Sequence, residues 1–65
     1  MKVTVNGAAV DVDDRVTVVE LLDELGFPAK GIAVAIDWEV LPRSDWHLAL
    51  TDGAKLEIVT AVQGG

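Results

Sequence analysis

Hydrophobic residues at every second position mark the first strands of the chain. Val3 and Val5 alternate with polar residues, which is the period of a half-buried strand. Asn6 and Gly7 follow, and both residue types tolerate the positive φ angles that a type I′ turn requires. The alternation resumes at Val10 and Val12. The pattern therefore predicts that the chain opens with a β-hairpin.

A helical period replaces the alternation after residue 16. Thr17 is a good N-cap, and Glu20 three residues later completes a capping box. Gly26 suits the left-handed position after a helix, and Pro28 prevents continuation. Apolar side chains recur at the i, i+3, i+4, i+7 spacing of one helix stripe, at Val18, Leu21, Leu22 and Leu25. The spacing predicts a helix too short to be stable unless it packs against a sheet.

The second half of the chain contains shorter strand signals. Residues 31–36 place large side chains on one face and alanines on the other. Residues 37–39 look like a turn, and Val40-Leu41 is a brief strand. We expect residues 43–50 to be irregular, with one helical turn. After a tight turn at Thr51-Asp52-Gly53, residues 55–60 form the last strand.

The order of these elements predicts an α+β fold of the β-grasp type. A mixed sheet of four to five strands would carry the one main helix on one face. A right-handed crossover through the helix would place the strand at 31–36 beside the first strand, parallel or nearly so. We expect residues 1–60 to form this domain and residues 61–65 to be a flexible C-terminal tail.

Composition and charge narrow the possible functions. The 65 residues include no cysteine, which excludes disulfides, redox motifs and thiolate metal sites. The net charge of −6 disfavours nucleic-acid binding. It indicates either solubility together with attraction to a basic protein partner or a solvated surface alone. The first residues lack a secretory leader, and no apolar run is long enough to cross a bilayer. We therefore expect a cytoplasmic protein that binds neither nucleic acid nor membrane.

Residues that could carry catalysis are sparse. His47 has no second histidine and no cysteine to form a zinc site. Residues 11–14 are acidic but lack the glycine and the final glutamate of a calcium loop. Ser44 has no visible base to activate it. We expect no catalytic activity, no bound cofactor and no metal site, while Trp38 and Trp46 fit either the core or an interface.

The last two residues, Gly64 and Gly65, stand apart from the other glycines. Each of the others has a local role in a turn, a helix end or a strand start: Gly7, Gly26, Gly31 and Gly53. No predicted element follows Gly64 and Gly65, so they are either a frayed end, a leftover linker or a chemical feature. A terminal carboxylate becomes reactive when it is adenylated. Glycine lets the backbone enter a narrow channel beside ATP, because it has no side chain.

Several motifs follow one another along the chain in a fixed order. They occupy residues 2–7, 17–22, 32–36, 40–44, 52–53, 56–59 and 64–65. In this order and spacing they cover essentially the full length and resemble the ThiS family, the ubiquitin-like β-grasp sulfur carriers of thiamine biosynthesis. The family often places Asn-Gly in the turn that is Asp37-Trp38 here, which changes the local contact surface and leaves the tail as it is.

The resemblance implies a mechanism in which other enzymes act on this chain. A partner adenylyltransferase of the ubiquitin-activating type would convert the Gly65 carboxylate to an acyl-adenylate, using ATP and magnesium. Sulfur from a persulfide donor would displace AMP and leave a thiocarboxylate. Thiazole synthase would then receive the sulfur. Gly65 matches the modified residue, and Gly64 matches the residue that permits threading.

A partner surface is expected on the sheet face away from the helix. Its candidate residues are Val59, Ala61, Val62 and Gln63, which are continuous with the tail. The apolar members of this set would equally serve to complete the core. Two other functions stay open: a molybdopterin-type sulfur carrier, and a passive ubiquitin-like interaction module that uses its surface and not its terminus.

Overall fold

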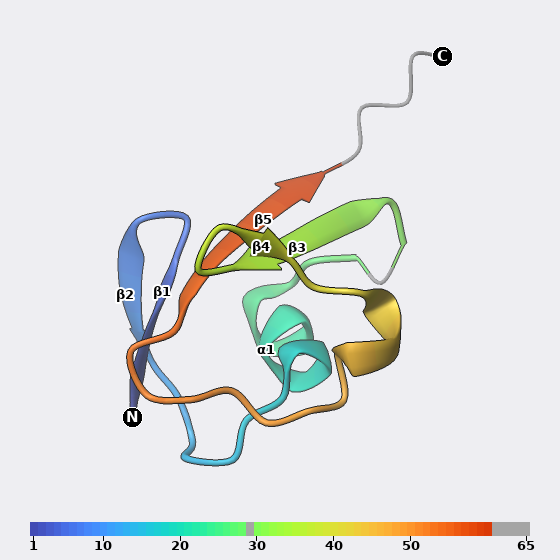
Figure 1. The fold of residues 1–65 in the computed structure, drawn as a ribbon. Helices are drawn as coiled ribbons and strands as arrows, with labels where there is room; N and C mark the ends of the chain where they lie inside the picture. Colours follow the sequence, from blue (N-terminus) through green and yellow to red (C-terminus); the bar gives the residue numbers. More distant parts are fainter. Residues whose placement is uncertain (29, 61–65) are drawn as a thin grey trace.

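The computed structural model describes residues 1–28 and 30–60 (Figure 1). Five strands form one mixed sheet in the order β2-β1-β5-β3-β4, and the helix lies across one face of it. The α+β architecture of the β-grasp type is thus confirmed. In chain order the elements are β1 (Lys2–Val5), β2 (Ala8–Asp11), α1 (Val18–Leu25), β3 (Ile32–Ile36), β4 (Glu39–Val40), the 3₁₀ turn η1 (Arg43–Asp45) and β5 (Lys55–Thr60).

The opening hairpin forms as the alternation predicts. β1 and β2 pair antiparallel, with Val3 opposite Val10. Asn6 and Gly7 join them with φ angles of 49° and 86°, so both residues are in the left-handed region that a type I′ turn needs. The Val3 side chain is buried on the side of the sheet that carries the helix.

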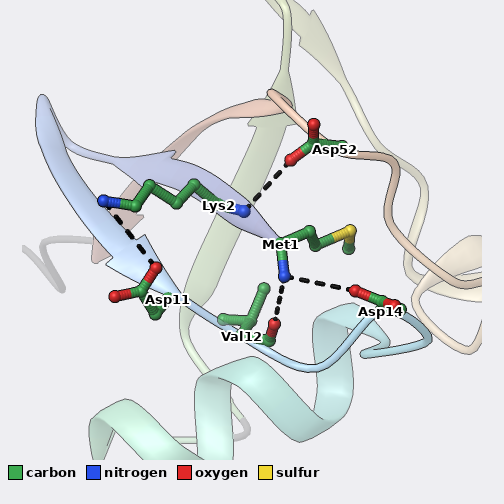
Figure 2. A network of polar contacts seen from close by, with 6 residues as sticks. All are labelled: Met1, Lys2, Asp11, Val12, Asp14 and Asp52. Carbon is green, nitrogen blue, oxygen red and sulfur yellow. Dashed lines mark hydrogen bonds and ion pairs between the residues drawn. The ribbon is translucent and has the colours of Figure 1, made fainter.

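The start of β1 is held by polar contacts to two other segments (Figure 2). The Met1 ammonium donates to the Val12 carbonyl at 2.8 Å and pairs with Asp14 at 3.2 Å. The Lys2 backbone N–H donates to the Asp52 carboxylate at 3.1 Å. These contacts connect the beginning of the chain to the end of the hairpin and to the turn before β5. Asp14 is largely exposed, so its ion pair contributes little to stability.

Helix α1 begins at the predicted capping box. The Thr17 hydroxyl accepts from the Glu20 N–H at 3.2 Å, and the Glu20 carboxylate accepts from the Thr17 N–H at 2.9 Å. These two bonds satisfy donors that the first helical turn leaves unpaired. The stripe residues Val18, Leu21 and Leu22 are buried against the sheet.

The last member of the predicted stripe, Leu25, is 39% exposed instead of buried. It lies in the final turn of α1, where the chain leaves the helix through Gly26 at a φ of 79°. Phe27 then packs against the core just beyond the helix end. The helix is therefore anchored by its first two turns.

The order of the strands differs from the predicted order at one place. The pattern places the strand at Ile32–Ile36 beside β1 and parallel to it. Both expectations are wrong, because β5 lies between the two strands and β3 runs antiparallel to β1. β5 pairs parallel with β1 and antiparallel with β3. A helix with its side chains is about 10–12 Å wide, roughly two strand spacings of about 4.8 Å. The crossover through α1 joins β2 to β3, which run parallel with β1 and β5 between them, so the helix spans these two inner strands.

The two tryptophans have opposite environments. Trp46 is buried, and its indole N–H donates to the Leu41 carbonyl at 3.2 Å. The Arg43 guanidinium lies 4.6 Å from the centre of its ring. Trp38 is 79% exposed. Trp46 therefore belongs to the core, and Trp38 does not.

The region between β3 and β5 follows the sequence pattern closely. The brief strand is Glu39–Val40, one residue earlier than expected. The expected helical turn is η1. The stretch after it packs beside the start of α1, because the Leu50 N–H donates to the Val16 carbonyl at 2.8 Å. Trp46 and Leu50 close the core on the helix side of the sheet.

Candidate functional site

The candidate site begins where β5 ends, at Thr60. Of the residues predicted to form it, Val59 is within the described chain and is 61% exposed, so it does not complete the core. The other predicted residues lie outside the described residues: Ala61, Val62, Gln63, Gly64 and Gly65.

Asn6 holds the last third of β5 in place. Its side-chain amide donates to the Ile58 carbonyl at 3.2 Å, and its side-chain oxygen accepts from the Ile58 N–H at 2.8 Å. The ladder between β1 and β5 stops at the pair Val5–Leu56, because the chain turns away at Asn6. The Asn6 side chain thus supplies the next pair of hydrogen bonds in place of the backbone. It positions β5 two residues before the strand ends.

The sequence indicated only the turn role of Asn6. An asparagine carries both a donor and an acceptor on one short side chain, so it can imitate a backbone amide. Which strand it contacts depends on the sheet order, and the sequence pattern predicted that order incorrectly at β5.

Replacing Asn6 with aspartate tests this contact. Aspartate keeps the acceptor and tolerates a positive φ, but it places a carboxylate oxygen against the Ile58 carbonyl and loses the donor. We expect the free energy of unfolding to fall by about 1–2 kcal/mol, as measured by urea denaturation.

The matched control is Asp37→Asn in the other hairpin. The Asp37 carboxylate accepts from the Lys55 N–H at 3.3 Å, and an asparagine oxygen can accept the same bond. We expect this variant to change stability by no more than about 0.5 kcal/mol. Equal stability of Asn6→Asp and the unchanged chain would contradict the role assigned to Asn6.

The sheet face opposite α1 is polar over β1 and β2. Lys2 and Asp11 lie opposite each other in the hairpin, and their charged groups are 3.8 Å apart. On the same face β5 begins with Lys55 and continues with Glu57. This half of the face is solvated and gives no sign of an apolar contact.

The other half of that face carries an apolar strip, here called the outer strip. It consists of Val59, Ala33, Ala35 and Val40, which belong to the three strands β5, β3 and β4. The register places Ala33 opposite Val59 and Ala35 opposite Val40, so the four side chains are neighbours. Val40 is 76% exposed. The outer strip is therefore an uncovered apolar surface that starts at the end of β5.

The turn between β3 and β4 lies at the other end of the outer strip. Asp37 and Trp38 form it with φ angles of 50° and 72°. Both central residues are thus left-handed, as in the Asn6-Gly7 turn, but neither is glycine. The predicted turn is confirmed, and its second residue is an exposed tryptophan in an unfavourable backbone conformation.

A shallow groove of about 460 Å³ lies on the helix side of the molecule. It is formed by α1, η1 and the residue that follows the helix end. Its lining residues are Val19, Glu20, Leu22, Asp23, Phe27, Arg43 and Trp46. The polar members of the lining are Glu20, Asp23 and Arg43, and the others are apolar.

Among residues 1–28 and 30–60, no group of three or more histidine, cysteine, aspartate or glutamate side chains is arranged to hold a metal ion. His47 is exposed in the loop after η1. In the same part of the chain, α1 has only 8 residues, and no helix has the length and apolar character needed to span a bilayer.

The family was identified by comparing the chain with known proteins. The ThiS family matches residues 3–65, which includes both terminal glycines. The chain belongs to the ThiS family. The match extends beyond β5 to the last residue of the sequence, so the tail is part of the family pattern and not an addition to it. The resemblance of the ordered motifs is therefore confirmed.

Solved structures similar to this ThiS-family chain share its fold. A crystal structure of the thiamine biosynthesis protein ThiS from Geobacter metallireducens covers all of both chains at 33% identity, with a TM-score of 0.82. SAMP1 from Haloferax volcanii is 22% identical over 98% of this chain and 97% of its own, with a TM-score of 0.64. At this low identity, the similarity to SAMP1 shows a shared fold and nothing about function.

A curated relative is much longer than this chain. It is a thiazole synthase of Paramagnetospirillum magneticum, 39% identical over 66 aligned positions that include the whole of this chain. The chain spans 20% of the length of that relative. A ThiS-like segment is thus part of a longer polypeptide in that protein.

Proposed function

We propose that the chain is a sulfur carrier for the synthesis of the thiamine thiazole and works in the cytoplasm. An adenylyltransferase of the ubiquitin-activating type would join the Gly65 carboxylate to AMP, using ATP and magnesium and releasing pyrophosphate. The outer sulfur of a persulfide donor would then attack the acyl-adenylate and displace AMP, which joins Gly65 to the donor cysteine through an acyl disulfide. A thiol would attack the donor sulfur of that disulfide, so that the thiocarboxylate is released on Gly65 and the donor cysteine and the thiol end as a disulfide. Thiazole synthase would take the sulfur from this thiocarboxylate. The chain itself supplies the terminal carboxylate that is modified, and it supplies no catalytic residue.

The family match through Gly65 is the observation that carries this proposal. A terminal glycine suits the reaction because it leaves the carbonyl free of a neighbouring side chain. Gly64 extends this freedom by one residue, which suits passage through a narrow channel. The absence of cysteine from the 65 residues agrees with a carrier that holds sulfur on its terminus alone.

The length of the tail limits where the enzymes can sit. Five residues follow Thr60, and they span at most about 17 Å when fully extended. An enzyme that reacts with Gly65 must therefore lie close to the end of β5. Val59 and the outer strip begin at that end and are exposed. The same enzyme can thus contact this surface while it holds the tail.

Intact-mass spectrometry tests the proposal directly. The chain is incubated with the adenylyltransferase from the same organism, ATP, magnesium, a persulfide donor and a thiol reductant. We expect a mass increase equal to the exchange of one oxygen for sulfur, localised to Gly65 by fragmentation. A reaction without ATP is the control and should leave the mass unchanged. No sulfur on Gly65 in the complete reaction would show that the proposal is wrong.

A further inference from the structure

The two hairpins of the sheet use the same kind of turn with different residues. In the first, Asn6 and Gly7 adopt positive φ angles at little energetic expense. In the second, Asp37 and Trp38 adopt φ angles of 50° and 72°. A left-handed conformation is unfavourable for a residue other than glycine, and Trp38 has no short polar side chain to offset it. The second turn therefore has a less favourable backbone conformation for its residues than the first turn.

The strain at Trp38 has no compensation within the described chain. Its side chain is 79% exposed, whereas Trp46 is 6% exposed and donates a hydrogen bond to Leu41. Among residues 1–28 and 30–60, no hydrogen bond of the Trp38 indole is found. Asp37 at least accepts from the Lys55 N–H. Residues held in strained conformations without a structural benefit often serve binding.

Trp38 also lies at the end of the outer strip. The strip runs from Val59, beside the end of β5, across β3 to Val40 in β4. Trp38 lies two residues before Val40, in the turn that joins these strands. Exposed tryptophans are among the residues that most often dominate binding energy at protein interfaces. The surface is continuous with the strand that leads to the tail.

We propose that Trp38 anchors this chain to thiazole synthase by inserting its indole into an apolar pocket of that enzyme. This inference rests on the proposed function, which makes thiazole synthase the protein that receives the tail. The length of the tail brings that enzyme close to the outer strip. The relative in which a ThiS-like segment belongs to a thiazole synthase polypeptide supports close contact between the two parts.

The charges near Trp38 in the sequence predict which residues surround that pocket on the partner. Trp38 is preceded by Asp37 and followed by Glu39 in the sequence, and the chain has a net charge of −6. Lysine or arginine side chains on thiazole synthase would complement them and speed association at low salt. The indole would contribute affinity, and the charges would contribute orientation and rate.

The substitution Trp38→Gly tests the anchor, because it should change stability and binding in opposite directions. Glycine is favoured at the second position of a type I′ turn, so the melting temperature should rise by about 4–8 °C. Loss of the indole should weaken binding to thiazole synthase from the same organism by about 30-fold. Calorimetric titration of the unmodified chain gives the dissociation constant, and thermal unfolding gives the melting temperature.

Leu48→Ser is the matched control, since Leu48 is 52% exposed in the loop after η1 and outside the outer strip. Its dissociation constant should stay within about twofold of the unchanged chain. Equal affinities of Trp38→Gly and the unchanged chain, or no binding by the unchanged chain, would overturn the anchor. So would a Trp38-dependent dimer of the chain alone in sedimentation. Binding needs no thiocarboxylate, so failure of sulfur transfer to Gly65 would be seen separately by mass.

Discussion

A chain that lacks Gly65 is expected to fold normally and yet support no thiamine synthesis. The deletion leaves β5 and its pairs with β1 and β3 untouched. It moves the terminal carboxylate back by about 3.5 Å, which takes it out of reach of an adenylating site built for the full tail. Growth of a strain with only this variant, on medium without thiamine, should stop. The isolated variant should gain no sulfur in the intact-mass assay.

The control for this deletion is Leu48→Ser, which keeps the whole tail and changes one exposed side chain in the loop after η1. It should support growth without thiamine, and thermal unfolding of both variants should lie close to that of the unchanged chain. Normal growth of the Gly65 deletion would argue against a carrier. It would favour a ubiquitin-like module that acts through its surface alone.

The second large effect is expected at Leu56, in the middle of the sheet. Its side chain is fully buried, in a strand with neighbours on both sides. Truncation to alanine removes buried methyl groups and leaves a cavity, so the free energy of unfolding should fall by about 3 kcal/mol. A domain of 65 residues has a stability of only about 3–10 kcal/mol, so the loss is a large part of the total. Urea denaturation measures it.

Val59→Ala in the same strand is the comparison for Leu56. Val59 is 61% exposed, and its truncation should change the free energy of unfolding by no more than about 0.5 kcal/mol. A loss below about 1 kcal/mol for Leu56→Ala would mean that the sheet can close around the missing atoms. A large loss for Val59→Ala would mean that the outer strip stabilises the fold, contrary to its assignment as a partner surface.

Local signals predicted the elements well because their causes are local. The capping box at Thr17, the Asn6-Gly7 turn and the alternation of β1 each depend on residues a few positions apart. The position of β5 depends on a fit between segments about 50 residues apart. No short-range period reports it, so the sequence reading placed β3 beside β1. The exposure of Leu25 likewise depends on where Phe27 packs.

The sequence points to Gly64 and Gly65 because no element of the fold needs them, and the family match includes both. Their modification and the partner surface at Val59 stay predictions. The roles of Asn6 and Trp38 were not predictable. The first depends on the position of β5, and the second on a backbone angle that a tryptophan seldom adopts.

The central place of β5 has a mechanical consequence. An enzyme that draws the tail into its channel pulls along the axis of the strand to which the tail is attached. β5 is bonded to β1 on one side and to β3 on the other, and Asn6 adds two bonds near its end. A pull along the strand stretches all of these hydrogen bonds at the same time, which is a shear geometry. Pulling an edge strand away from a sheet would instead break its bonds one after another. In the proposed function, the domain would therefore keep its structure while an enzyme threads, activates and releases the terminus.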